Sequence, residues 1–135
     1  MSSTQVMDTY RTPDAIQEDL YGPTFMLPSS NQLRYEFRLF GIPENLSNDV
    51  ACDIGGQQAR GPGCVNTLIY WSSVQEQPWS VDEQFELVTS MLYALGHQMP
   101  EESLEKAEEH LVREYNHALR IQAIQNSISA NTTLN

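Results

Sequence analysis

The chain has 135 residues, enough for one domain to bury a hydrophobic core without disulfides or a structural metal. Its net charge of −11 and its single lysine oppose binding to nucleic acid and to anionic membranes. A hydrophobic content of 40% argues against wholesale disorder, and no apolar run approaches the length that spans a bilayer. We therefore expect a folded protein with neither nucleic acid nor a membrane as partner.

The N-terminal part predicts a short ordered segment after a mobile arm. Residues 1–12 are polar and small, which is typical of such an arm. Pro13 then opens a pattern in which Ile16 and Leu20 lie four residues apart, as in a short helix with proline in its first turn. Residues 24–27 form an apolar run closed by proline, which predicts an edge strand.

The middle of the chain predicts two longer strands around a short helix. Residues 33–40 alternate between apolar and charged side chains, the period-two pattern of a strand buried on one face. Residues 47–54 show helical spacing and are followed by a glycine-rich loop over residues 55–63. Residues 64–74 are rich in β-branched and aromatic side chains, which favours a second strand.

The last third of the chain predicts two helices. Ser80 and Glu83 have the spacing of a capping box, and apolar residues follow at helical spacing over residues 81–95. Gly96 stands where a left-handed C-terminal cap is expected. Pro100 restarts the pattern, and the lack of glycine or proline beyond it permits a helix to Ile128, followed by a frayed tail over residues 130–135.

The apolar stripe of this last helix changes direction along its length. Leu104, Leu111 and Tyr115 centre on one side, whereas Ile121, Ile124 and Ile128 lie about 100° round the helix. A straight helix cannot press both sets against one flat surface. The three isoleucines, here called the isoleucine stripe, therefore meet either another part of the core or another chain.

These elements predict an α+β fold: a small, mostly antiparallel sheet packed against two long C-terminal helices, within one domain over residues 13–129. We expect helix 81–95 to lie between the sheet and the last helix. Cys52 and Cys64 form no disulfide framework, and no secretory signal precedes them, so we expect reduced thiols and a cytoplasmic protein.

Three groups of residues have the chemistry of a reactive or ligand-binding site. His110, Glu114 and His117 share one helical face, but their spacing matches no established metal motif, so we predict neither metal nor cofactor. Arg60 is the one cation of the glycine-rich loop and could clamp an anionic ligand, although the simpler interpretation is a surface connection.

Cys64, with His97 as a base, has the residue types of a thiol nucleophile, yet nothing local supports that role. A second alternative concerns Trp71 and Trp79, which flank the break between the second strand and the first long helix. They mark either a partner-binding site or a packing contact across that turn.

These exclusions leave three hypotheses about the function of the protein. The first hypothesis is a non-enzymatic, acidic protein-interaction module, such as an assembly factor, adaptor, chaperone or structural subunit. Its partner would be a basic protein, a protein with an apolar groove, or a second copy of the chain. The alternatives are a DNA-mimicking inhibitor of a nucleic-acid-binding protein and a small ligand-binding protein or enzyme that uses Arg60.

Overall fold

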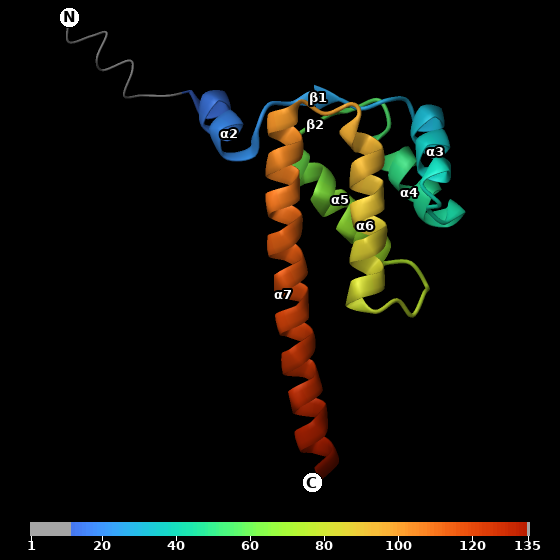
Figure 1. Ribbon diagram of the computed structural model, residues 1–135, viewed down its shortest axis with the longest axis vertical. Coiled ribbons are helices and arrows are strands. Elements are labelled where there is room, and N and C mark those ends of the chain that lie inside the picture. The colour runs from blue at the N-terminus through green and yellow to red at the C-terminus, as the bar shows by residue number, and fades with distance from the viewer. Residues whose placement is uncertain (1–11, 135) are drawn as a thin grey trace, which may run out of the picture.

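The computed structural model describes residues 12–134 as a mostly helical protein with one small sheet (Figure 1). The elements in chain order are α2 (Pro13–Tyr21), β1 (Phe25–Met26), α3 (Ser30–Leu39), α4 (Glu44–Ile54), β2 (Gln58–Ala59), α5 (Gly61–Ser73), α6 (Val81–Gly96) and α7 (Glu101–Leu134). The predicted arm over residues 1–12 falls almost wholly outside the described residues. No described helix has the length and apolar content needed to cross a bilayer.

The first two predicted elements are confirmed. Thr12 caps α2 by accepting a hydrogen bond from the amide of Ala15 at 3.1 Å, and Pro13 occupies the first turn. The edge strand is β1, which pairs antiparallel with β2 so that Phe25 faces Ala59. The sheet therefore consists of two short strands, and one of them lies in the segment predicted to be a loop.

The predicted strand over residues 33–40 is wrong, because this segment forms α3. Ser29 caps the helix by accepting a hydrogen bond from the amide of Gln32 at 3.2 Å. Leu33 and Phe37 are fully buried, whereas Tyr35 and Leu39 are 55% and 65% exposed. Positions four apart lie on one face in a helix as well as in a strand, so the alternating pattern was ambiguous.

The second predicted strand, residues 64–74, is also wrong and forms most of α5. A proline in the first turn costs the helix no hydrogen bond, since the amides there have no partner within the helix. Cys64, Leu68 and Ser72 are buried at four-residue spacing, with Val65 beside them. Burial of this face outweighs the modest strand preference of its β-branched and aromatic residues.

The predicted helix over residues 47–54 is confirmed and begins three residues earlier, at Glu44. Its end packs closely on α3. Ser30 Oγ donates a 2.7 Å hydrogen bond to the Ala51 carbonyl, and a Cβ at Gly55 would lie only 2.2 Å from Ser30 Oγ. Gly55 therefore serves a close approach between helices.

The helices of the last third are confirmed, with different ends. Ser80 and Glu83 form the capping box of α6, with hydrogen bonds of 3.1 and 3.3 Å. Gly96 is not the left-handed cap that was predicted: it ends α6, and the described glycines with positive φ are Gly22, Gly41 and Gly56. α7 has 34 residues and continues past Ile128 to Leu134.

The arrangement corrects the predicted layers. The central helix is α5, which packs against α4, α6 and α7, while α6 also meets α3. The two-stranded sheet lies at one end of the helices and forms no layer beneath them (Figure 1). The fold is therefore a helical assembly with a small antiparallel ribbon, and the expectation of a sheet covered by α6 and α7 is wrong.

Candidate functional site

The first part of α7 closes the hydrophobic core. Ser103 and Ala107 are fully buried, and Leu111 is 9% exposed. Ser103 Oγ donates a 2.5 Å hydrogen bond to the Pro23 carbonyl. On the facing helix, a Cβ at Gly61 would lie 2.2 Å from the Ser103 carbonyl oxygen and 3.1 Å from Ala107 Cβ. The absence of a side chain at Gly61 thus lets α5 approach α7 closely.

The last part of α7 extends beyond the other helices. Figure 1 shows the helix projecting past α5 and α6, and every residue from Arg120 to Ala130 is exposed. Ile121, Ile124 and Ile128 are 42%, 59% and 60% exposed. The isoleucine stripe therefore lies outside the hydrophobic core formed by the described residues 12–134.

The isoleucine stripe continues a line of residues that starts against α5. Spacings of four and three residues alternate along His110, Glu114, His117, Ile121, Ile124 and Ile128. At the start of this line, His110 Nε2 lies 2.7 Å from Asn66 Oδ1 of α5. Alternating spacings of four and three keep side chains on one face of a helix and are typical of helix-to-helix seams. The stripe thus occupies the face of α7 that α5 covers further up.

The two parts of α7 differ in their number of charged side chains as well as in burial. Residues 80–114 carry nine of the eighteen acidic residues of the chain, with Lys106 and Arg113 as the cations. Residues 115–135 carry a single charged side chain, that of Arg120. The exposed isoleucines therefore lie in a nearly uncharged segment of an acidic protein.

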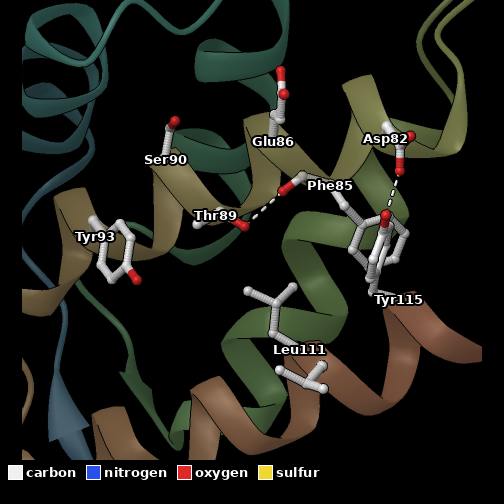
Figure 2. Close-up of a pocket in the computed structure, with 9 residues that line it drawn as sticks. Asp82, Phe85, Glu86, Thr89, Ser90, Tyr93, Leu111 and Tyr115 are labelled. Carbon is white, nitrogen blue, oxygen red and sulfur yellow. Dashed lines mark hydrogen bonds between the residues drawn. The ribbon is translucent and has the colours of Figure 1, made fainter.

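A second surface is an open groove between α6 and α7 of about 710 Å³ (Figure 2). Its apolar part includes Phe85 and Leu111, which belong to the core, and Tyr93 and Val112, which are 50% and 57% exposed. Asp82 and Glu86 line the same groove, and no cation does. These side chains suit an amphipathic segment that carries basic residues.

One end of this groove is closed by an interaction between the two helices. The Tyr115 hydroxyl of α7 donates a hydrogen bond to Asp82 Oδ1 of α6, and the Tyr115 ring packs on Phe85 with centroids 5.3 Å apart (Figure 2). The hydrogen bond to Asp82 raises the pKa of Tyr115 above its ordinary value. The sequence did not predict the groove, although Asp82, Glu86 and Tyr93 have the spacing of one face of α6.

The two tryptophans lie apart from the isoleucine stripe. Trp71 on α5 donates a 2.8 Å hydrogen bond from Nε1 to Asp53 Oδ2 of α4, and its ring meets Tyr70 edge-on at 5.1 Å. Trp79 precedes α6, and both tryptophans are half-buried against the core. Their indole rings thus contribute to packing, and their role in binding a partner stays a prediction.

Arg60 links two distant segments of the chain beside the small sheet. Its Nη1 donates a 2.7 Å hydrogen bond to the Gly22 carbonyl, and it lines a shallow depression with Glu18, Pro23, Thr24 and Gln58. Two glycines of the predicted loop, Gly55 and Gly61, are explained by the close helix contacts described above, and Gly56 has a positive φ of 73°. A ligand at Arg60 stays a prediction with no added support.

The histidines form no metal cluster. Among the side chains that the structure describes, no three of His, Cys, Asp or Glu are placed to hold one metal ion. His110 contacts Asn66 and lies 3.7 Å from Glu114, whereas His117 is exposed. Burial lowers the pKa of His110, with Glu114 opposing and Arg113 adding to that shift. This histidine is therefore a neutral packing residue at neutral pH.

Cys64 is unsuited to act as a nucleophile. The thiol is 2% exposed within α5, and burial raises its pKa to about 12. It therefore remains protonated at neutral pH. His97, proposed as its base, is exposed at the C-terminal cap of α6.

Comparison of the chain with protein-family models, curated protein sequences and solved structures found no match. The assignment of a function therefore depends on the two surfaces of α6 and α7 described above.

Proposed function

We propose that this protein is a non-enzymatic protein-interaction module that binds through the projecting end of α7. The observation that carries the proposal is the exposure of Ile121, Ile124 and Ile128 on the end of α7, which carries no charged side chain after Arg120 and extends beyond the core. Isoleucines at i, i+3 and i+7 are the anchors by which an amphipathic helix binds an apolar groove or another helix. An assembly factor, adaptor or structural subunit uses this kind of contact.

The energy available limits the kind of partner. Full burial of one isoleucine side chain contributes about 1.5–3 kcal/mol. Association costs roughly 4–15 kcal/mol in lost freedom before any side chain is ordered. Three partly exposed isoleucines cannot offset that cost alone, so the partner must bring apolar side chains of its own. We therefore expect a partner with an apolar groove or stripe, and a contact of moderate affinity.

The test is a comparison of three tagged forms of the chain expressed in its source cells together with an untagged copy. The forms are the parent, Ile124→Asp and Asn126→Asp. Asn126 is exposed and lies on the opposite side of α7 from Ile124, so it controls for the added charge.

Quantitative mass spectrometry of the recovered proteins then decides the proposal. We expect one protein, either a different chain or the untagged copy, to be retained by the parent and by Asn126→Asp and lost at least tenfold with Ile124→Asp. Recovery of the same proteins in equal amounts by all three forms would contradict the proposal.

A further inference from the structure

The isoleucine stripe continues the face of α7 that packs against α5, and α5 ends before it reaches the stripe. Gly61 lies against Ser103, and Asn66 lies beside His110, so α5 and α7 run in the same direction. At equal rise per residue, α5 ends at Ser73 near the level of His117. The isoleucine stripe begins at the next position of the line, Ile121. A second helix placed there would continue the packing that α5 provides above.

The chain itself has the chemistry required of that second helix. Its own residues 115–135 offer isoleucines at alternating spacings of four and three and carry one charge, that of Arg120. Two such segments bring six isoleucines together without burying a carboxylate. Isoleucine at both core positions of a seam shifts the preference from pairs of helices to bundles of three or four. The net charge of −11 makes copies repel one another, and a contact through residues 121–128 brings no carboxylates of the two copies together.

We infer that the partner of the isoleucine stripe is a second copy of this chain, so that the projecting ends of α7 associate into a short helical bundle. This inference rests on the proposed function, whose binding surface it shares, and it names the partner. The bundle leaves the acidic bodies outside the contact and buries Ile121, Ile124 and Ile128 of each copy. Its affinity is moderate, because each copy contributes only two helical turns.

Sedimentation of the full chain tests the inference directly. The parent is measured from about 1 µM to about 1 mM, a range that brackets moderate affinities. We expect its mass to rise with concentration from 15.3 kDa towards a whole multiple of that value. Ile124→Asp should remain at 15.3 kDa throughout, and Asn126→Asp should behave as the parent. Circular dichroism of each variant confirms that it is folded.

Salt provides a second readout with a definite sign. Added salt screens repulsion between the acidic bodies and does not weaken contacts between isoleucines. Association of the parent should therefore persist or strengthen between about 0.05 M and about 0.5 M salt. Association that disappears at the higher salt concentration would overturn the inference, because it would reveal a contact held by charge.

Two further results would overturn the inference. The first is a parent that stays monomeric at all concentrations, and the second is equal association of the parent and Ile124→Asp. The first result would leave the proposed function standing, provided that the tagged parent still recovers a different chain in an Ile124-dependent manner. Loss of that recovery would remove the proposed function as well, so the two failures are distinguishable.

Discussion

The two parts of α7 differ in what they contact, although they belong to one continuous helix. Around Ser103, Ala107 and Leu111 the helix is buried against α5 and the chain preceding β1. From Arg120 to Ala130 every residue is exposed. A helix propagates readily once it is nucleated, so the packed part can support the exposed part without further contacts. The first part of α7 therefore stabilises the fold, whereas the second leaves its side chains accessible to solvent.

The largest expected effect comes from disturbing the packed part at Gly61. In Gly61→Ala the new Cβ would meet the Ser103 carbonyl oxygen at 2.2 Å, so α5 and α7 must move apart. We expect the free energy of unfolding to fall by about 1–3 kcal/mol. The control is Gly63→Ala in the same helix, where a Cβ meets nothing within 4 Å. Denaturant unfolding should show Gly63→Ala to be as stable as the parent or more stable, and equal loss in both variants would contradict the packing account.

A smaller effect should separate two serines of the same helix. Ser103→Ala removes the buried hydrogen bond to the Pro23 carbonyl, and we expect a loss of about 1 kcal/mol in unfolding free energy. Ser127→Ala makes the same change in the exposed part, where surface substitutions alter stability by less than about 0.5 kcal/mol. Thermal or denaturant unfolding compares the two. A Ser127→Ala loss as large as that of Ser103→Ala would show that the end of α7 also belongs to the core.

The smallest expected effect is a pH dependence of stability caused by His110, which stands at the start of the line of residues that leads to the isoleucine stripe. Burial lowers the pKa of His110 in the folded protein, so the unfolded chain binds a proton first as pH falls below its ordinary value of 6.5. This residue therefore destabilises the fold progressively from that pH downward, until the folded protein is protonated too. As the pH falls from 7 to 5, the free energy of unfolding of the parent should therefore decrease relative to that of His110→Gln. A difference in unfolding free energy that does not change with pH would contradict a lowered pKa of His110 in the folded protein.

The sequence predicted the starts of α2 and α6 correctly but not the nature of α3 and α5. Local hydrogen bonds at Thr12 and at Ser80 with Glu83 determine where α2 and α6 start, and such bonds are visible in a short window. The strands predicted over residues 33–40 and 64–74 failed for a different reason. Leu33 and Phe37 fit both periods, and the β-branched residues of α5 are helical because their face is buried by neighbours distant in the chain.

The candidate site was predictable in part. The displacement of Ile121, Ile124 and Ile128 from the main apolar stripe followed from helix geometry alone, and the structure adds that the three side chains are exposed. The groove between α6 and α7 could not be predicted, because it depends on how two helices lie relative to each other. The glycines around Arg60 suggested a ligand loop, whereas Gly55 and Gly61 permit close helix contacts that only the tertiary structure reveals.

Amide hydrogen exchange along α7, measured in dilute and in concentrated protein, tests most directly the claim that one helix serves both the core and a partner. We expect amides over residues 103–118 to be protected at both concentrations, because they belong to the core. Amides over residues 120–130 should exchange rapidly in dilute protein and become protected as concentration rises. Strong protection of residues 120–130 in the dilute monomer, or rapid exchange at every concentration, would contradict the account.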